Sequence, residues 1–138
     1  AYRLNGRVDV GIDIGGDGNR PGGQRATLTV QPGVTIFGAS GADYLVINRG
    51  SQIVAEGTET NPITFTSQTQ IAGTIDEVNA IGQWGGLVIL GRAPIGNCNT
   101  AVAAGTVNCQ AEVEGISGTP ALYGGAIGND RSGSLRYV

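Results

Sequence analysis

The chain has 138 residues, a length that fits one domain. Apolar side chains make up 40% of it and charged side chains 14%, against about a quarter in an average globular protein, so the composition can build a core and is not that of a disordered chain. The net charge of −3 does not fit a nucleic-acid-binding protein, which usually carries a basic surface. The chain has no histidine, which excludes catalytic pairs and metal sites that need an imidazole. No apolar run approaches the roughly 20 residues of a membrane-spanning helix.

Glycine is the outlier of the composition. It provides 25 of the 138 residues, about 18% against a usual value of about 7%, which indicates many tight turns between short elements. Residues 11–26 form a long polar stretch that predicts a loop, and residues 67–83 predict a second one. We therefore expect an all-β chain with Gly-rich loops, folded as a single domain over residues 1–138.

Strand patterns begin after the first loop. Residues 27–30 alternate apolar and polar side chains, residues 31–33 (Gln-Pro-Gly) predict a turn, and residues 34–36 resume the alternation. The same arrangement returns 17 residues later, with a strand at 45–47 and a turn at 48–50 (Asn-Arg-Gly). A constant offset of this kind indicates an internal repeat.

The second half repeats at a longer distance. Steps of 24 residues connect four apolar pairs: Ile63 and Phe65, Leu87 and Ile89, Ala111 and Val113, Leu135 and Tyr137. Short strands at a period of 17 to 24 residues predict a right-handed parallel β-helix of roughly six short coils, each stacking its strand on the previous one. The alternative is an antiparallel sandwich or barrel, which also has many short strands and glycine turns.

Several phrases of the sequence resemble those of a known protein family. They are Leu-Thr-Val-Gln-Pro-Gly-Val-Thr-Ile at 28–36, Ala-Glu-Gly-Thr at 55–58 before Asn-Pro-Ile-Thr-Phe-Thr-Ser at 61–67, Gln-Trp-Gly-Gly-Leu-Val-Ile-Leu-Gly at 83–91, and Leu-Tyr-Gly-Gly at 122–125 before the final strand pattern. The chain resembles the secreted or surface (lipoprotein-type) right-handed β-helix proteins of bacteria, which mostly have no assigned function. The resemblance implies a β-helix and an extracellular or cell-surface location, and it carries over no catalytic residues.

The last residues, Leu135 to Val138, continue a strand pattern. Two interpretations stay open. The chain is the N-terminal part of a longer solenoid, or its open last coil recruits another chain, because unpaired strand edges are templates for pairing.

The two cysteines, Cys98 and Cys109, bracket a loop of ten residues. A catalytic or metal-binding thiol would need a histidine or a third cysteine, and the chain has neither. We therefore predict a disulfide, formed in an oxidising compartment, that stabilises the fold by about 2–3 kcal/mol through loop closure.

Asp9, Asp13 and Asp17 recur at intervals of four in a Gly-rich segment and are candidate calcium ligands, because Ca²⁺ binds carboxylate and carbonyl oxygens. Their spacing matches neither the EF-hand loop nor the Gly-rich nonapeptide repeat. A solvated loop of Asx turns, with no bound metal, is the alternative.

Five other residues are candidates for a glycan site. Glu112 and Glu114 flank Val113 and would project from one face of a strand, as paired carboxylates do in glycoside hydrolysis. Arg92 and Arg136 could hold an acidic sugar, and Trp84 could stack on one. The alternative is a charged solvent face for the glutamates and a core position for the tryptophan.

These observations favour a non-enzymatic extracellular or cell-surface scaffold for adhesion, display or end-to-end, filament-like assembly, and we assign no catalytic residues. The expected partner is a second copy, or further coils, at the open C-terminal coil. The alternative function is that of a carbohydrate-active or glycan-binding β-helix protein that acts on acidic polysaccharide. No cofactor other than calcium is expected.

Overall fold

The computed structural model describes residues 1–138 and consists of short strands with a single helical turn. In chain order the elements are β1 (Tyr2–Arg3), β2 (Val8–Val10), β3 (Thr27–Val30), β4 (Thr35–Gly38), β5 (Tyr44–Ile47), β6 (Gln52–Glu56), β7 (Thr64–Ser67), α1 (Gln68–Ile71), β8 (Gly86–Ile89), β9 (Ala111–Glu112), β10 (Leu122–Tyr123) and β11 (Gly133–Arg136). The expectation of a nearly all-β chain is therefore confirmed.

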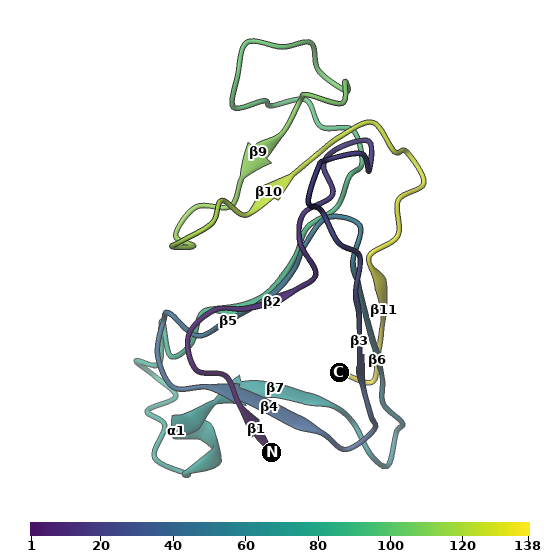
Figure 1. Cartoon of the computed structure of the whole chain (residues 1–138). Helices are drawn as coiled ribbons and strands as arrows, with labels where there is room; N and C mark the ends of the chain where they lie inside the picture. Colours follow the sequence, from purple (N-terminus) through teal and green to yellow (C-terminus); the bar gives the residue numbers. More distant parts are fainter.

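Nine of the strands form three parallel sheets, with the orders β1-β4-β7, β2-β5-β8 and β3-β6-β11. Viewed along the direction of stacking, these sheets form the three sides of a triangle (Figure 1). Each sheet has three strands, so the chain passes around the triangle three times. The expected number of roughly six coils is therefore wrong, because each coil contains three strands and is longer than the predicted period.

The 17-residue repeat does not mark stacked strands. Leu28 pairs with Ile53, 25 residues later, and Leu45 pairs with Leu87. Leu28 and Leu45, which the repeat had placed in equivalent positions, lie in different sheets. The 17-residue repeat therefore connects β3 with β5, which are two strands apart along the chain and belong to different sheets.

The 17-residue repeat arises because two corners of the triangle are formed by turns of the same kind. The turn at 31–34 is closed by the N–H of Val34, which donates to the carbonyl of Gln31, and the turn at 48–51 is closed in the same way. Gly33 and Gly50 occupy the same position in these turns, with φ of 77° and 84°, a region that favours glycine. Two corners of one kind thus give a regular spacing although the strands beside them belong to different sheets.

The 24-residue repeat fails for a different reason. Phe65, Leu87 and Leu135 lie on three different sheets, and Ala111 lies outside the triangle. β9 pairs antiparallel with β10, which makes a hairpin within residues 91–132. We call residues 91–132 the insert, because they separate β8 from β11 and extend beyond the triangle at the corner where those two sheets meet (Figure 1).

The core fills the inside of the triangle. In β6, Ile53 and Ala55 are buried while Glu56 is exposed, the alternation expected of a strand with one face in a core. Eight buried side chains form the main cluster: Leu4, Val30, Ile36, Leu45, Ile47, Ile53, Ala55 and Ile63. Most of the large ones come from the middle coil, which has a coil on either side of it.

A second, smaller cluster lies outside the triangle. Val46 points away from the main core, is fully buried, and packs with Leu90 and Ala121. Ala121 belongs to the insert, and Val113 and Ile116 of the insert add to the same cluster. The insert therefore covers the outer face of the sheet β2-β5-β8.

We predict that Ile53→Ala lowers the free energy of unfolding by about 2–4 kcal/mol, because the side chain is 1% exposed at the centre of the core and its removal leaves a cavity. Denaturation in urea, followed by circular dichroism, measures the change. Val78→Ala is the control, since Val78 is 90% exposed and should change stability by less than about 0.5 kcal/mol. Equal effects of the two substitutions would contradict this placement of the core.

Candidate functional site

One corner of the triangle carries most of the polar structure. The strands β2 and β3 are joined there by residues 11–26, which we call the β2–β3 loop, and β8 and β11 are joined there by the insert. Between them, the middle coil joins β5 to β6 by a tight turn that contains Arg49. A short turn thus lies between two long segments of the neighbouring coils, the β2–β3 loop and the insert. We call these two segments the excursions.

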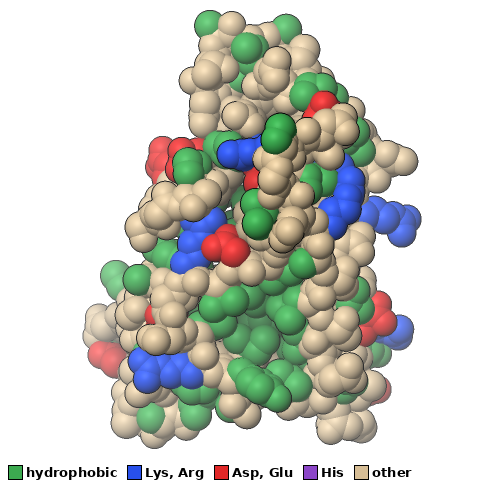
Figure 2. Space-filling model, viewed as in Figure 1, with side chains coloured by type: hydrophobic (Ala, Val, Ile, Leu, Met, Phe, Trp, Pro, Cys, Tyr) green, Lys and Arg blue, Asp and Glu red, His purple; other side chains and the backbone are tan.

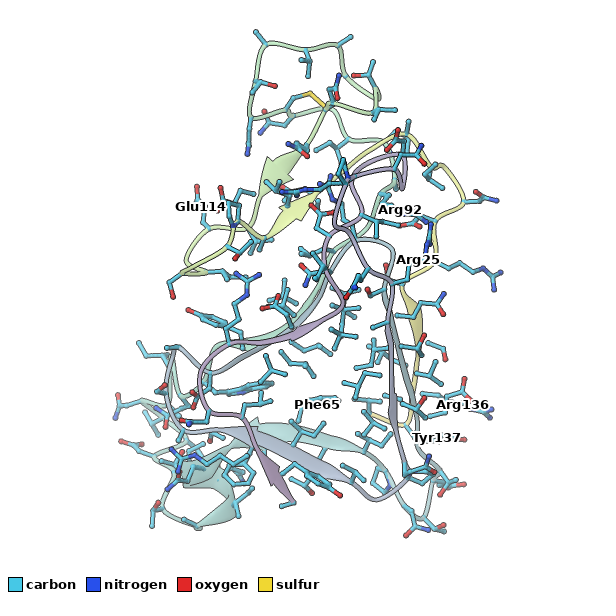
Figure 3. The ribbon with its side chains drawn as sticks, viewed as in Figure 1. Arg25, Phe65, Arg92, Glu114, Arg136 and Tyr137 are labelled. Carbon is cyan, nitrogen blue, oxygen red and sulfur yellow. A yellow bond between two sulfur atoms is a disulfide. The ribbon has the colours of Figure 1, made fainter.

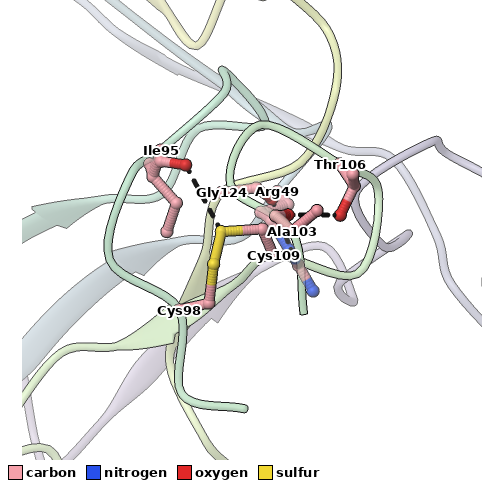
Figure 4. The surroundings of a disulfide bond; sticks show 7 residues. All are labelled: Arg49, Ile95, Cys98, Ala103, Thr106, Cys109 and Gly124. Carbon is pink, nitrogen blue, oxygen red and sulfur yellow. Dashed lines mark hydrogen bonds between the residues drawn. A yellow bond between two sulfur atoms is a disulfide. The ribbon is translucent and has the colours of Figure 1, made fainter. Parts of the chain in front are cut away.

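Arg49 fills the space between these excursions, and its side chain is 1% exposed. Its Nε and Nη2 donate to the two carboxylate oxygens of Asp13, in the β2–β3 loop, at 2.7 and 2.6 Å. Its Nη1 donates to the carbonyl of Gly124 at 2.8 Å, and Nη2 also donates to Oε1 of Gln110 at 3.0 Å. The guanidinium therefore binds both excursions at once. Figure 4 shows Arg49 beside Gly124 of the insert.

Asp13 is the counter-charge of this network. Burial alone would raise the pKa of its carboxyl, but the hydrogen bonds and charge of Arg49, the N–H of Gly15 and the side chain of Arg20 outweigh burial and lower the pKa. Arg20 donates to Asp13 at 2.7 Å and is half exposed. Asp13 is thus an ionised carboxylate held by two arginines.

Three other contacts fix the insert. Arg92 donates from its backbone N–H and from Nε to Asp130, at 2.7 and 2.9 Å, which closes the base of the insert. Arg7, between β1 and β2, donates to the carbonyls of Ser117 and Thr119 at its tip. The insert therefore leaves the third coil after β8, contacts the first coil at its tip and rejoins the third coil at β11.

The predicted disulfide between Cys98 and Cys109 is confirmed, with its sulfurs bonded and its Cα atoms 4.9 Å apart. Cys109 is fully buried, and its sulfur lies 3.3 Å from the carbonyl oxygen of Ile95. The bond closes the outermost loop of the insert directly beside Arg49 and Gly124 (Figure 4).

The β2–β3 loop and the insert enclose two polar hollows. One, of about 330 Å³, is bordered by Gly16, Arg20, Arg49, Asn108 and Gln110, and only two of its ten lining residues are hydrophobic. We call it the corner hollow. The second, of about 390 Å³, lies towards Arg7 and Thr119, and Arg20 borders both.

The three calcium candidates are held apart by different partners. Asp9 accepts hydrogen bonds from Arg7 and Asn48, Asp13 accepts them from Arg49 and Arg20, and Asp17 accepts them from Asn19. The structure has no group of three or more acidic, Cys or His side chains arranged to hold a metal ion. The three aspartates border the two hollows, where arginines are their neighbours.

The five glycan candidates lie at different places. Glu112 and Glu114 are exposed on the hairpin of the insert, Arg92 is paired with Asp130, and Arg136 lies on β11 with its guanidinium 5.2 Å from the ring centre of Tyr137 (Figure 3). Trp84 is partly buried against the main core. The structure therefore does not bring these five residues together, and a role for each remains a prediction.

Sequence reasoning missed Arg49, the central residue of the corner. The available signal was its position in the repeated turn, where Arg49 occupies the place that Pro32 holds one repeat earlier. A proline suits this turn position, because its fixed φ matches it, and an arginine there indicates a side chain with another role.

Three parallel sheets stacked around one core define the class of this protein as a parallel β-helix. The sequence profile of the family described as pectate-lyase like beta helix domain matches residues 19–138, and the chain belongs to this family. No curated protein and no solved structure gave a match. No helix of this chain has the length and apolar character needed to cross a membrane.

We predict that Arg49→Met destabilises the chain by about 3–5 kcal/mol, because it leaves the Asp13 carboxylate in a buried site without its main partner. Chemical denaturation measures the loss. Arg131→Met is the matched control, since Arg131 is exposed and no ion pair holds it. A loss of less than 1 kcal/mol for Arg49→Met, on the order of a surface substitution, would show that the network is not needed for the fold.

A second prediction concerns acid. Burial raises the pKa of Asp130, but hydrogen bonds from the side chain and backbone of Arg92 outweigh it, so the pKa is lower in the folded chain than its ordinary value of 3.8. Such a group stabilises the fold above the pKa of the unfolded state, and that stability is lost as the pH falls through the folded pKa.

We therefore expect the free energy of unfolding to decrease below about pH 4, and to decrease less steeply in Asp130→Asn. Urea denaturation at a series of acidic pH values gives both slopes. If the free energy of unfolding fell equally steeply with pH in both proteins, protonation of Asp130 would not be a cause of the loss of stability in acid.

Proposed function

We propose that this chain is a non-enzymatic β-helical scaffold whose units associate end to end. The observation that carries the proposal is that the core is open to solvent at the end formed by the first coil. A cavity of about 320 Å³ enters the triangle there, and eight of its ten lining residues are hydrophobic, among them Tyr2, Val8, Leu28 and Ile36. Figure 2 looks into this opening, where hydrophobic side chains form the floor of the triangle.

Each sheet also ends in unpaired strands. β1, β2 and β3 are the edge strands at the end formed by the first coil, and β7, β8 and β11 are those at the other end. Edge strands carry free N–H and C=O groups that pair readily with another chain. Both ends have the same three sides in the same order, so the last coil of one copy matches the first coil of the next.

The registers make this match specific. Tyr2 stacks on Ile36, which stacks on Phe65, and Val8 stacks on Leu45, which stacks on Leu87. A third row connects Val30, Ala55 and Leu135. Each inward row thus ends in an apolar side chain on both sides, and Leu135 is 48% exposed. A second copy whose first coil lies about 4.8 Å beyond the last coil of this one would continue all three rows.

The charges at the two ends also complement each other. Residues 1–26 carry four arginines and three aspartates, whereas residues 57–90 and 133–138, which include β7, β8 and β11, carry three acidic side chains and one arginine. Opposite net charges favour head-to-tail contact over contact between like ends. The occupant that we propose for the open cavity is therefore the last coil of a second copy.

We place this scaffold on the outside of a bacterial cell, in adhesion or surface display. The disulfide supports an oxidising compartment, and membership of the pectate-lyase-like family is compatible with an extracellular location. The resemblance to bacterial surface β-helix proteins supports the same setting.

A second candidate is a glycan-binding or carbohydrate-active protein for acidic polysaccharide. The observation that favours it is the family itself, which is described as pectate-lyase like. Glu112 and Glu114 remain candidates for acid–base catalysis, although no hydrogen bond of their side chains to another residue holds either one in place. Fold alone is a poor guide to activity, so this candidate is secondary.

We expect Val8→Arg and Leu135→Arg each to abolish end-to-end association, because each places a charge in an apolar contact, at opposite ends. Analytical ultracentrifugation of the 138-residue chain measures the assembly. An equimolar mixture of the two variants should form only dimers, since one intact last coil meets one intact first coil. Val78→Arg, in an exposed loop, is the control and should assemble like the unmodified chain.

Monomers of the unmodified chain at all accessible concentrations would overturn the proposal. Dimers of either variant alone would overturn the head-to-tail arrangement. Circular dichroism of the separate variants checks that they are folded, and dimer formation in the mixture checks it independently.

A further inference from the structure

The corner hollow has the features of a small-ligand site. Three segments surround it: the β2–β3 loop, the turn at Arg49, and the part of the insert that includes the end of the disulfide loop and residues after it. Its volume of about 330 Å³ is at the lower end of the range of about 300–1,000 Å³ typical of ligand pockets. Unlike the open end of the first coil, it is lined mainly by polar groups.

Two deeply placed donors beside this hollow lack acceptors. The backbone N–H of Gly16, a buried residue, donates to no group in the protein, although its carbonyl accepts from Ala126. Arg49 has five N–H bonds, of which four have protein acceptors, and one on Nη1 has none. Buried backbone N–H groups without a partner are rare in proteins, because each one costs free energy comparable to a lost hydrogen bond.

The side chain of Gln110 adds a donor whose direction is fixed. Its Oε1 accepts from Arg49, and a guanidinium can only donate, so the oxygen faces Arg49 and the amide nitrogen faces away. That nitrogen has no protein acceptor. Arg20 also uses only its Nη1, in one bond to Asp13, which leaves its Nε and Nη2 free at the rim of the hollow.

The carboxylates beside the hollow already accept hydrogen bonds. Both oxygens of Asp13 are bound by Arg49 and Arg20, and Asp17 accepts from the backbone and side chain of Asn19. Asp13 and Asp17 together balance the charges of Arg49 and Arg20, so these four side chains are neutral overall. The unpaired groups identified above are N–H donors, and their complement is an oxyanion.

We propose that the corner hollow binds a carboxylate or sulfate group, with Arg20, the Gln110 amide and the Gly16 N–H as its donors. The rest of the pocket has room for a sugar-sized polar body that carries this group. The inference goes beyond end-to-end association and does not depend on it, and it gives the second candidate function a site other than Glu112 and Glu114.

The walls of the hollow are preformed. A Cβ built on Gly16 would lie 2.4 Å from the carbonyl oxygen of Val107 and 2.9 Å from Cα of Gly125, so the insert packs directly on the backbone of the loop. The disulfide at Cys109 holds the wall that carries Gln110. A site that is already in place needs little ordering when a ligand binds.

Gln110→Glu is the most discriminating variant. A glutamate keeps an oxygen that accepts from Arg49, so the network and the fold are retained, but it replaces the donor facing the hollow by an anion. Arg20→Gln removes the charge at the rim. We expect each variant to weaken binding of a charged ligand by about 10- to 100-fold, the range for a charged hydrogen bond. Arg131→Gln, which removes an arginine outside the hollow, should leave binding unchanged.

Isothermal titration at low salt measures binding of four probes: an oligogalacturonate, a sulfated oligosaccharide, a neutral oligosaccharide of equal length, and sodium sulfate. The proposal expects binding of at least one charged probe, weakened by salt, by Arg20→Gln and by Gln110→Glu. Sulfate that competes with the charged oligosaccharide identifies the shared anion as the recognised group, whereas binding of sulfate alone identifies a free anion as the ligand.

The proposal is overturned if no charged probe binds, if the neutral oligosaccharide binds as tightly as the charged ones, or if binding survives Gln110→Glu. Thermal melting verifies that both variants are folded. The end variant Val8→Arg should bind the charged probe as the unmodified chain does, so that failure of assembly and failure of anion binding are measured separately.

Discussion

The structure of the corner depends on one buried guanidinium. Arg49 lies in the tight turn of the middle coil, while the coils on either side send out 16 and 42 residues at the same corner, the β2–β3 loop and the insert. Removing a charge from water is costly unless every polar group finds a partner. Asp13 from one excursion, and Gly124 and Gln110 from the other, provide acceptors for four of the five N–H bonds of Arg49. The position of each excursion is therefore coupled to that of the other.

This coupling explains how two long irregular segments acquire fixed walls. Loops of this length are usually mobile unless their backbone groups are bound. Here the insert is closed at its base by Arg92 and Asp130, is cross-linked near its outer loop by the disulfide, and contacts the first coil at its tip through Arg7. Each arginine binds a carboxylate or carbonyl of a distant segment. A chain without lysine thus uses the planar, multidentate guanidinium at each of these positions.

The sequence predicted the local features of the fold but not its long-range pairing. Alternation identified strands such as β3 and β5, the two-cysteine argument identified the disulfide, and the polar composition of residues 11–26 identified the loop. The coil number was wrong because equal corner turns at Gly33 and Gly50 imitate a repeat of whole coils. The corner network was out of reach, since Arg49 and Gly124 are 75 residues apart and no pattern connects them.

The fold separates two kinds of surface that a scaffold can use independently. The ends are apolar and repeat the inward rows of the core, so they favour contact with another β-helix of the same shape. The corner hollow is polar and presents N–H donors, so it favours a charged small group. The middle coil lies between the ends and also supplies Arg49 to the corner, and it contains the most deeply buried side chains. Its stability therefore supports both surfaces, while substitutions at one surface leave the other intact.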